Sequence, residues 1–474
     1  MRLPLYICVI ITLLIDVIHC DHHKNHDKGV NRTIEDFQGK EHHNVKHHEE
    51  GHHGEEHHSE KHHEKKHHGK GHDEDHHREN VHDHKHPGEK HHDQEHPEDV
   101  NICQKITSAN TGFAFNFYKH QTSNGKSGNV FVSPISISTA LGMLSLGARV
   151  KTHKEILEGM GFNLREISEK DVHASFHHLM QNLNTSNSEL HLSTGNALFI
   201  QKDLPLLPQF LHDVKSHYDS EVLSSNFNNQ EEAKKQINNF VLEKTHGKIS
   251  ELLPNIDPGT VLVLVNHIFF KGSWTQPFNS NFTAEEDFFV DENTTVKVPM
   301  MRRYSTFNSH WDADLSCRVV QLDYAGNASA MLILPKQGKM KLVEDALSAA
   351  TLEKWTKSLS PQVVNLYVPK FSISVATDLI ETLKEMGIKE VFTDNADLSG
   401  ITTSPGLKVS QAVHKAALSL DEKGTEAAGA TAIGIMPISF VFPTKFNYPF
   451  LLLIRHHITN SILFLGKIVN PTIM

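Results

Sequence analysis

The chain has 474 residues, of which 38% are hydrophobic and 22% charged, and its formal net charge is −11 with histidines neutral. Length alone predicts two or three domains, but composition divides the chain into three unequal parts: residues 1–20, 21–100 and 101–474. No G-x-S-x-G, P-loop or dinucleotide-binding fingerprint is present, so we expect no enzymatic activity. No nucleic-acid partner is expected either.

The first part has the pattern of a secretory signal peptide. Arg2 precedes an apolar run over residues 3–18 that only Asp16 interrupts, and cleavage is expected near Cys20. A membrane anchor is the alternative, but the run is short for the roughly 20 residues of a spanning helix. No other segment is long and apolar enough to cross a bilayer, so we expect a secreted, extracellular protein with no membrane partner.

Over residues 21–99 the second part has almost no apolar side chains and cannot form a core, so we expect it to be disordered. It holds 24 of the chain's 39 histidines, together with 12 basic and 21 acidic residues. Histidine pairs recur at a spacing of five, which keeps no single face of an α-helix. The regular pairs are His42 and His43, His47 and His48, His52 and His53, His57 and His58, His62 and His63, and His67 and His68.

These paired histidines have a binding interpretation and an inert one. Neutral imidazole binds Zn, Cu and Ni, so the pairs are candidate ligands of many weak sites rather than one closed site. Because imidazole titrates near pH ~6.5, modest acidification would also make this tail net positive and able to bind a polyanion. A solvated spacer is the equal alternative, and no cofactor is required. Two H-E-x-x-H matches, at His48 and His63, lie in this polar repeat and are read as accidental.

The third part mixes helices and strands without regular βαβ alternation, which predicts an α+β domain. Helices are predicted at residues 101–121, 134–147, 152–159, 169–184, 206–216, 231–245 and 341–348. Strands are predicted at residues 195–200, 262–270, 317–323, 330–334, 363–375, 409–420 and 448–455.

Cys103 and Cys317 remain after removal of the signal peptide. Two cysteines in a large domain make no disulfide framework, so we expect free thiols, with an intramolecular bridge as the alternative. In a secreted protein the five N-x-S/T triplets are candidate glycosylation sites on exposed turns, and the strongest lies in a Gly-bearing turn at Asn327. The full set is Asn31, Asn184, Asn281, Asn293 and Asn327.

Residues 421–439 read D-E-K-G-T-E-A-A-G-A-T-A-I-G-I-M-P-I-S. Small, uncharged side chains at successive positions suit a segment that slips between two packed strands, whereas ordinary loops are polar and stay on the surface. We therefore interpret this segment as an exposed loop that can also become a buried central strand.

This pattern resembles the hinge and reactive loop of the serpins, and the resemblance covers nearly all of residues 101–474. The matching segments follow the family's order and are most similar to its antitrypsin and antichymotrypsin branch. They are residues 129–148 (N-V-F-V-S-P-I-S-I-S-T-A-L-G-M-L-S-L-G-A), 194–200 (T-G-N-A-L-F-I), 262–274 (L-V-L-V-N-H-I-F-F-K-G-S-W), 315–335, 396–401, 409–416 and 464–471. The resemblance implies three β-sheets with eight or nine helices and an exposed reactive loop.

It also implies a monomeric suicide inhibitor of a serine protease. The protease's serine would attack the loop to form an acyl-enzyme, and the cleaved loop would insert into the central sheet before water releases the ester. Counted as in the family, the reactive bond joins Ile438 and Ser439. The implied hinge residues are Glu422, Gly424, Thr425, Glu426, Ala427, Ala428, Gly429, Ala430 and Thr431.

Further positions match residues that control opening of the family's central sheet. Trp274 matches a bulky residue where the loop inserts, and Arg302 and Glu422 match a charged pair beside it. A polar cluster beneath the central strands is also implied, which would hold the sheet closed and exchange hydrogen bonds as it opens. Ordinary core polar groups are the alternative. The residues of this cluster are Ser133, Ser136, Asn266 and His414.

Ile438 restricts the target protease. A β-branched side chain disfavours the deep basic-residue pocket of trypsin-like enzymes, so we expect an elastase-like target. Met436, Phe440 and Phe442 allow a shifted reactive bond for a chymotrypsin-like protease. A non-inhibitory carrier of a small hydrophobic ligand or hormone is the alternative function, although carriers of this branch have lost the hinge that is intact here.

Overall fold

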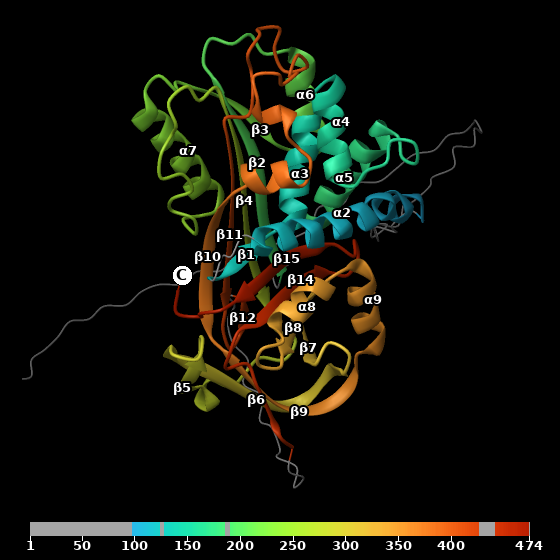
Figure 1. The fold of residues 1–474 in the computed structure, drawn as a ribbon, viewed down its shortest axis with the longest axis vertical. Coiled ribbons are helices and arrows are strands. Elements are labelled where there is room, and N and C mark those ends of the chain that lie inside the picture. The colour runs from blue at the N-terminus through green and yellow to red at the C-terminus, as the bar shows by residue number, and fades with distance from the viewer. Residues whose placement is uncertain (1–96, 124–127, 185–189, 426–440, 474) are drawn as a thin grey trace, which may run out of the picture. The chain divides into compact units, whose positions relative to one another are not determined.

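Two hydrogen-bonded β-sheets form the frame of the computed structural model, which describes residues 97–123, 128–184, 190–425 and 441–473 (Figure 1). The α-helices are α2 (Pro97–Ser123), α3 (Pro134–Ser145), α4 (Val150–Gly159), α5 (Glu169–Asn184), α6 (Pro208–Tyr218), α7 (Gln230–Lys244), α8 (Met340–Ala346), α9 (Ala349–Ser358) and α10 (Ile380–Glu385). The strands are β1 (Val130–Val132), β2 (Leu190–Gln201), β3 (Glu221–Ser225), β4 (Leu262–Ser273), β5 (Ala284–Phe289), β6 (Thr295–Asp312), β7 (Cys317–Asp323), β8 (Ala328–Pro335), β9 (Ser360–Pro369), β10 (Phe371–Asp378), β11 (Gln411–Leu420), β12 (Gly424–Thr425), β13 (Pro443–Lys445), β14 (Phe450–His456) and β15 (Ile462–Ile468).

Several predicted features lie outside the described residues. They are the signal peptide, Asn31, the reactive bond between Ile438 and Ser439, and the hinge from Glu426 to Thr431. All twelve histidines proposed as metal ligands also lie outside them, so the structure does not test that prediction. These are His42, His43, His47, His48, His52, His53, His57, His58, His62, His63, His67 and His68.

Met1–Gly88 and Glu89–Met474 are separate units. The second unit contains both sheets. Within the described residues no helix is long and apolar enough to cross a membrane.

The larger sheet has the strand order β1-β15-β14-β8-β7-β6-β9-β13, with β5 added beside β6. Strand β6 is 18 residues long. It pairs with β9 over residues 300–309 and with β7 over residues 308–312. This long strand therefore joins what the family resemblance treats as two smaller sheets into one hydrogen-bonded sheet.

The second sheet has the order β10-β11-β4-β2-β3, and its central strand β4 is buried at nine consecutive positions, L-V-L-V-N-H-I-F-F. Such a continuous apolar run is typical of a strand covered on both faces. Ile268 and Phe270 pack into the core cluster that contains α3, whereas Val265 and Phe269 pack into the cluster that contains α7. Because successive side chains point to opposite faces of a strand, β4 contributes residues to the cores on both sides of the sheet.

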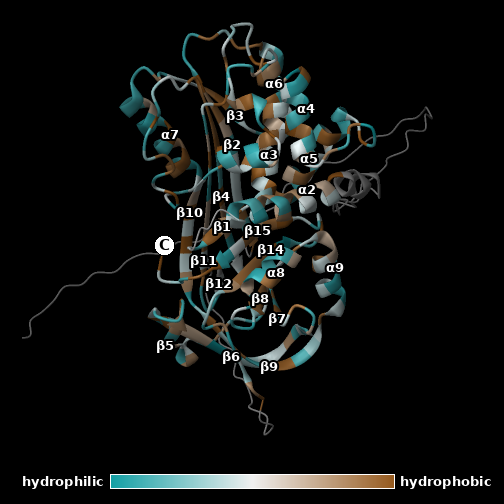
Figure 2. Cartoon of the chain, in the orientation of Figure 1, coloured by the Kyte–Doolittle hydropathy of each residue, from teal (hydrophilic) through white to brown (hydrophobic). Residues whose placement is uncertain are grey.

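The two covering helices are buried to different degrees. All twelve residues of α3 are buried, whereas α7 buries Ala233, Ile237 and Val241 at helical spacing and exposes its polar residues (Figure 2). Figure 1 shows α7 on one side of the strands and α3 on the other. Helix α3 is thus a central element of the core, and α7 is a surface helix.

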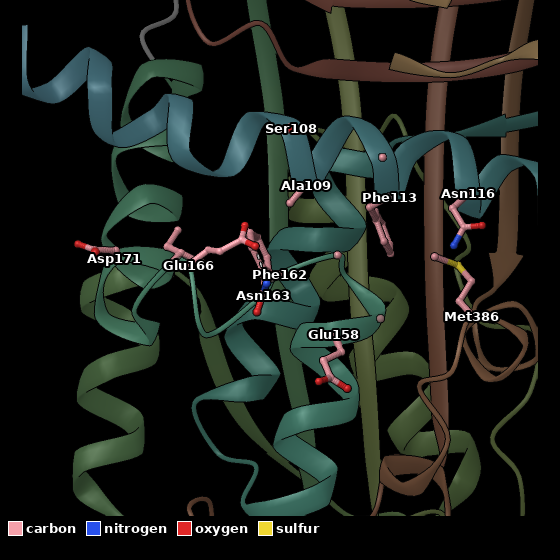
Figure 3. Close-up of a pocket in the computed structure, with 14 residues that line it drawn as sticks. Ser108, Ala109, Phe113, Asn116, Glu158, Phe162, Asn163, Glu166, Asp171 and Met386 are labelled. Atoms are coloured by element: carbon pink, nitrogen blue, oxygen red, sulfur yellow. Dashed lines mark hydrogen bonds between the residues drawn. The ribbon is translucent and has the colours of Figure 1, made fainter. Parts of the chain in front are cut away.

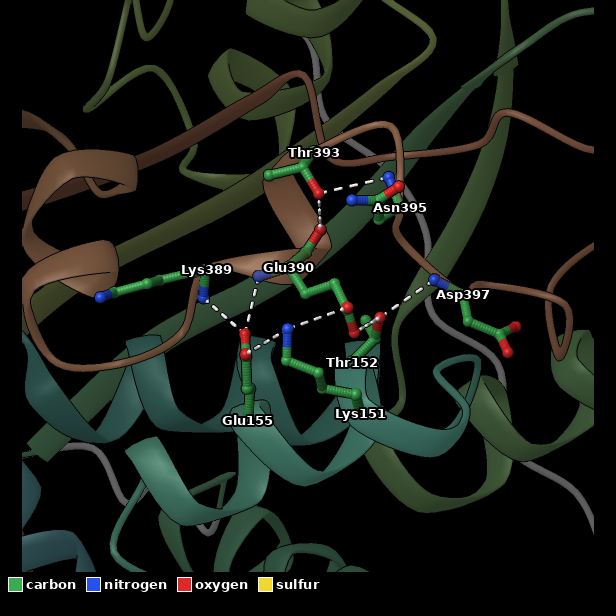
Figure 4. A network of polar contacts seen from close by, with 8 residues as sticks. All are labelled: Lys151, Thr152, Glu155, Lys389, Glu390, Thr393, Asn395 and Asp397. Carbon is green, nitrogen blue, oxygen red and sulfur yellow. Dashed lines mark hydrogen bonds and ion pairs between the residues drawn. The ribbon is translucent and has the colours of Figure 1, made fainter.

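A polar network attaches the segment after α10 to α4 (Figure 4). The Glu155 carboxylate accepts the backbone N–H groups of Lys389 and Glu390, at 2.9 and 2.7 Å. The hydroxyl of Thr152 donates to the Glu390 carboxylate at 3.0 Å and accepts the N–H of Asp397 at 3.0 Å. These bonds fix the chain segment that leads towards β11.

The α+β prediction is confirmed, but several predicted elements differ from the structure. The strand predicted at 363–375 is two strands, β9 and β10, which belong to different sheets and are separated at Lys370. The helix predicted at 341–348 ends at Ala346, because Ser348 caps a new helix, α9. Strand β6 was not predicted, since Pro299 and two arginines interrupt its apolar pattern.

Cys317 opens β7 and is a buried free thiol, as predicted. Burial, with the nearby Asp312 carboxylate, raises the pKa of Cys317 to about 12. The thiol therefore stays protonated and unreactive at neutral pH. Cys103 lies in α2, and its side chain is outside the described residues.

Candidate functional site

Strands β4 and β11 run parallel and pair directly, from Gln411 opposite Val263 to Leu418 opposite Phe270. We call this contact the β4–β11 junction. Among the described residues no strand separates the two along this contact. A strand added between β4 and β11, antiparallel to both, would replace their single parallel hydrogen-bond ladder by two antiparallel ladders. The junction is therefore the place that any strand added between β4 and β11 would occupy.

Beyond β11 the chain reverses and begins a new strand. Asp421 and Gly424 exchange backbone hydrogen bonds of 2.8 and 3.3 Å. Gly424 then pairs with Ser273 of β4, and Thr425 with Gly272, in the antiparallel direction. Gly424 has φ of 142°, and a Cβ there would overlap the carbonyl oxygen of Gly272, so only glycine fits. The first hinge residues thus already have the direction of an inserted strand.

Trp274 lies at this end of the β4–β11 junction, where the resemblance placed it. Its indole Nε1 donates to the carbonyl oxygen of Asp421 at 3.0 Å. Its backbone N–H donates to the carbonyl oxygen of Lys423 at 2.9 Å. The buried ring stacks on Tyr324 with centroids 4.3 Å apart. Trp274 therefore fastens the turn onto the end of β4.

The predicted Arg302–Glu422 pair is wrong. Glu422 accepts from Lys370 Nζ at 2.9 Å and from the Thr283 hydroxyl at 2.8 Å. Arg302 instead extends along β9, where its Nε donates to Asn365 Oδ1 at 3.0 Å. Burial by itself raises the pKa of Glu422, but the bonds from Lys370, its own amide and Thr283 hold that pKa below its ordinary value. Lys370 supplies the cation because the break between β9 and β10 places it beside the turn.

Ser133, Ser136, Asn266 and His414, which we call the gate cluster, meet beneath the β4–β11 junction. His414 Nε2 accepts the backbone N–H of Ser133 at 3.0 Å, and the Nδ1 side of the ring bonds to Asn266 Oδ1. The Asn266 amide nitrogen donates to the carbonyl and hydroxyl oxygens of Ser136, at 3.1 and 2.5 Å. Since Ser133 is also the N-cap of α3, the gate cluster joins both central strands to the start of that helix.

The hydrogen bonds of His414 define its tautomer. Because Nε2 accepts from Ser133, the proton lies on Nδ1 and is donated to Asn266. Burial, with the nearby His267, lowers the pKa of His414 to about 3. Protonation of His414 at Nε2 would place that N–H against the backbone N–H of Ser133, and the hydrogen bond between them would be lost. The gate cluster is therefore complete only while His414 is neutral.

Two further residues extend the gate cluster and were not among the predicted site residues. Asn266 Nδ2 also donates to Asn196 Oδ1 at 2.5 Å, and the Ser136 hydroxyl bonds to that of Thr194 at 3.1 Å. Polar residues within the buried strand T-G-N-A-L-F-I were the available signal. The amide nitrogen of Asn196 is buried without a hydrogen-bond partner. An unsatisfied donor of this kind costs roughly 1–3 kcal/mol of stability, so the closed sheet keeps one buried hydrogen-bond donor unpaired at Asn196.

Three candidate glycosylation residues are exposed. Asn281 lies in the 3-10 turn η1 (Ser280–Phe282), Asn293 in the turn between β5 and β6, and Asn327 in the turn between β7 and β8. Asn184 is the last residue of α5, and its side chain is outside the described residues.

A cavity of about 620 Å³ lies away from the β4–β11 junction, between α2, α4 and the start of α5 (Figure 3). Its volume is within the range of small-ligand sites. Apolar side chains and three carboxylates share its wall, so a ligand here would be partly polar. The residues that define this character are Ala109, Phe113, Phe162, Ile167, Met386, Glu158, Glu166 and Asp171.

Comparisons with known proteins agree with this arrangement. A family model described as Serpin (serine protease inhibitor) matches residues 108–471. Alpha-1-antiproteinase 2 of Equus caballus is 51% identical over 78% of this chain and 87% of its own length. Alpha-1-antiproteinase of Bos taurus is 50% identical over 78% of this chain and 89% of its own length.

Solved structures give the same result. Human thyroxine-binding globulin in complex with its hormone superposes with a TM-score of 0.75 and 46% identity, covering 78% of this chain and 100% of that one. Human glycosylated kallistatin gives a TM-score of 0.75 and 42% identity, with 78% and 99% coverage. With the family model, the relatives and the β4–β11 junction in agreement, this chain belongs to the serpin (serine protease inhibitor) family and is not an enzyme.

Proposed function

We propose that this protein is a secreted inhibitor that traps a serine protease as an acyl-enzyme by inserting its cleaved loop at the β4–β11 junction. The observation that carries this proposal is the direction of β12, which pairs antiparallel with β4 before any cleavage. Similarity to the alpha-1-antiproteinases supports the inhibitory function, and the signal-like first 20 residues support secretion.

The register of β12 predicts where the inserted loop will lie. Continuing from Thr425 opposite Gly272, each further loop residue meets one residue earlier on β4. Thr431 then lies opposite Asn266, which is itself paired with His414 of β11. The loop would thus bring a small hydroxyl side chain directly to the gate cluster as the two central strands separate.

The same register separates the loop into two faces. Ala427, Gly429 and Thr431 would face the core that contains α3, where β4 presents Phe270 and Ile268. Small side chains are required there because that core is already packed. Glu426 would lie on the opposite face across from Lys271, whose side chain is exposed, and this cross-strand pair of opposite charges is favourable. The one charge in the hinge therefore does not oppose insertion.

The free energy for trapping would come from the new strand. About 14 inserted residues gain net backbone hydrogen bonds of ~0.5–1.5 kcal/mol each, which amounts to on the order of 10–20 kcal/mol. This is comparable to the stability of a whole domain. A protease tethered to the loop by its ester would be carried along and held before hydrolysis.

The elastase-like target is part of this proposal and depends on Ile438 as the residue before the cleaved bond. A shallow apolar protease pocket accepts its β-branched side chain, and the relatives named antiproteinase are consistent with such a target. A chymotrypsin-like protease would use a neighbouring bond at Met436 or Phe440.

The decisive experiment mixes the purified protein with elastase and with chymotrypsin and resolves the products on denaturing gels. A stable band at the summed mass, together with a large rise in the melting temperature of the cleaved protein, is the expected result. Cleavage without a covalent band for every serine protease tested, and an unchanged melting temperature, would refute the proposal. Mass spectrometry of the released peptide identifies the reactive bond.

The paired histidines of the tail are proposed to bind Zn, Cu or Ni weakly, or a polyanion at acidic pH. Neutral imidazole is a suitable ligand for these metals. Retention on a zinc-loaded column should then fall when the twelve paired histidines are replaced by glutamine. The set is His42, His43, His47, His48, His52, His53, His57, His58, His62, His63, His67 and His68. Unchanged retention would assign the tail to the role of a spacer.

A carrier function is the second candidate, because the cavity in Figure 3 has the volume of a small-ligand site and a relative of known structure is a globulin bound to thyroxine. Equilibrium dialysis with thyroxine tests it. Saturable binding that is lost in Phe113→Trp, combined with no covalent protease complex, would favour the carrier. The turn at Gly424 and the antiparallel start at Thr425 favour the inhibitor.

A further inference from the structure

Arg303 of β6 carries a positive charge between two buried aromatic rings. The Cζ atom of its guanidinium lies 4.9 Å from the ring centroid of Phe278 and 4.3 Å from that of Phe307. The Nε atom is buried and makes no hydrogen bond. Burial lowers the pKa of Arg303 to about 10, so the side chain is still a cation at neutral pH. The side chain as a whole is half-buried, so the Nη end of the guanidinium stays accessible.

No described residue supplies an anion for this guanidinium. Asp323 attracts it through space, but no carboxylate of the described chain is within ion-pair distance and no described group accepts a hydrogen bond from it. Other arginines of the same sheet differ, because Arg302 donates to Asn365 Oδ1 and Arg318 to Gln362 Oε1, each at 3.0 Å. A buried charge without a partner is strongly unfavourable. The guanidinium is therefore a site that an anion from another molecule can complete.

Arg303 lies between the two ends of the proposed reactive loop. Phe278 donates its backbone N–H to the carbonyl oxygen of Glu422 at 2.7 Å, just before the loop. On the other side, Leu366 of β9 pairs both with Arg303 and with Thr444 of β13, just after the loop. Because neighbouring strands lie about 4.8 Å apart, the Cα atoms of Arg303 and Thr444 are roughly 10 Å apart. Figure 1 shows β6 and β9 at the end of the fold opposite α6.

This position is within reach of a protease that binds the loop. The proposed reactive residue Ile438 is five residues before Pro443, the first residue of β13, so the two are at most about 18 Å apart. A protein interface of about 800 Å² on each partner extends roughly 16 Å from its centre. We propose that Arg303 binds a surface carboxylate of the docked protease and so contributes to the choice of target. This inference rests on the proposed inhibitory function and adds one contact to the same interface.

The chemistry of the site favours a carboxylate. Two parallel N–H groups of a guanidinium match the two carboxylate oxygens, which gives a bidentate pair. A guanidinium stacked on aromatic rings is weakly hydrated and suits an ion pair at an interface. Phe278 and Phe307 also keep water from its faces, so the pair is screened less than an exposed one. Such a contact speeds association and disfavours proteases that present a cation at this point.

The test measures docking separately from trapping. Elastase whose catalytic serine is replaced by alanine forms no acyl-enzyme, so its affinity for the full-length protein reports docking alone. Arg303→Met keeps an apolar stem between the rings and removes the charge, and we expect it to weaken this affinity about tenfold. Arg303→Gln removes the charge but keeps donors, and a similar loss is expected, so the result does not depend on the folding of one variant. Melting temperatures verify that both variants fold.

Arg302→Met is the matched control. It removes one positive charge from the adjacent position, where the guanidinium already has Asn365 as its acceptor, and should change the affinity less than about twofold. Replacement of single protease carboxylates by amides then identifies the partner. One such change should weaken docking of the wild type but not of Arg303→Met.

Equal affinity of the wild type and both Arg303 variants would overturn this inference and leave the inhibitor proposal intact. Stabilisation of the wild type by sulfate, without any difference in protease affinity, would show a site for free anions alone and would overturn it too. A tenfold loss of docking in the variants, with no covalent band for active protease, would support this contact and refute the inhibitor proposal. No docking of the wild type to any serine protease tested would overturn both.

Discussion

His414 on β11 accepts the backbone N–H of Ser133, the residue that caps α3, through Nε2 at 3.0 Å. This bond connects a strand at the β4–β11 junction to the central helix of the core. It exists only for the neutral imidazole, so protonation of His414 and the stability of the closed sheet are coupled.

The closed sheet should therefore lose stability as pH falls below about 6.5. The pKa of His414 is 6.5 without burial and about 3 in the folded protein, so between these values the unfolded chain binds a proton that the folded chain does not. Each pH unit in this window lowers the free energy of unfolding by at most about 1.4 kcal/mol for this group. His267, with a folded pKa of about 4, contributes in the same direction.

Urea unfolding midpoints measured from pH 7 to pH 4 test this coupling. His414→Gln should be less stable at pH 7, by roughly 1–3 kcal/mol, since Ser133 loses its acceptor, and its pH dependence should be shallower. His191→Gln, at an exposed position of β2, should keep the wild-type slope. A slope in His414→Gln as steep as in the wild type would show that other groups cause the acid sensitivity.

Replacement of Thr425 by Arg should convert the proposed inhibitor into a substrate. Thr425 is paired opposite Gly272, and continued insertion buries this position beside the core that contains α3. An unpaired buried charge is strongly unfavourable, so insertion should stall while the loop is still cleaved. Gels should show cleaved protein without the covalent band, and cleavage should no longer raise the melting temperature.

Lys423→Arg is the control for this substitution, because Lys423 is exposed in the same turn and keeps its charge. It should form the covalent complex at the wild-type rate. A covalent complex formed equally well by Thr425→Arg would exclude β12 as the start of the inserted strand.

The position of Thr425 was predictable from sequence, whereas the partner of Glu422 was not. The run of small residues after Gly424 is a local pattern, and of the predicted hinge the structure describes Glu422, Gly424 and Thr425, the last two as strand β12. Lys370 pairs with Glu422 only because the chain changes sheets at Pro369. Pro369 and Lys370 interrupt the apolar pattern over residues 363–375, but nothing local indicates that the two strands on either side belong to different sheets.

The gate cluster shows a similar contrast. Asn266 and His414 are polar residues inside apolar strands, so their unusual positions were visible in the sequence. Asn196 is likewise a polar residue inside the apolar strand β2, but nothing in the sequence indicated that it bonds to Asn266. His173 is four residues from its partner Glu169 on α5, so that contact was visible in the sequence, whereas the approach of His153 to Glu169 depends on how α4 and α5 pack. No local pattern contains that information.

The Glu422–Lys370 contact should be measurable as a coupling energy. A double-mutant cycle with Glu422→Gln and Lys370→Ala should give roughly 1 kcal/mol, because Glu422 is 12% exposed but Lys370 is 45% exposed and screened by solvent. The matching cycle of Glu422→Gln with Arg302→Ala should give a value near zero, since Arg302 bonds to Asn365. A larger coupling energy for Glu422 with Arg302 than with Lys370 would show that Arg302, and not Lys370, is the partner of Glu422.

Removal of the Glu155 carboxylate should loosen the segment that leads towards β11 (Figure 4). In Glu155→Ala the N–H groups of Lys389 and Glu390 lose their acceptor, which should lower the free energy of unfolding by about 1–2 kcal/mol. Glu155→Gln keeps an acceptor oxygen and should recover part of this loss. Glu158→Ala, in an exposed pair with Lys154 at 3.8 Å, should change stability by less than about 0.5 kcal/mol. Hydrogen exchange at the amides of Lys389 and Glu390 should accelerate in Glu155→Ala alone, and unchanged exchange there would show that the contact does not hold this segment.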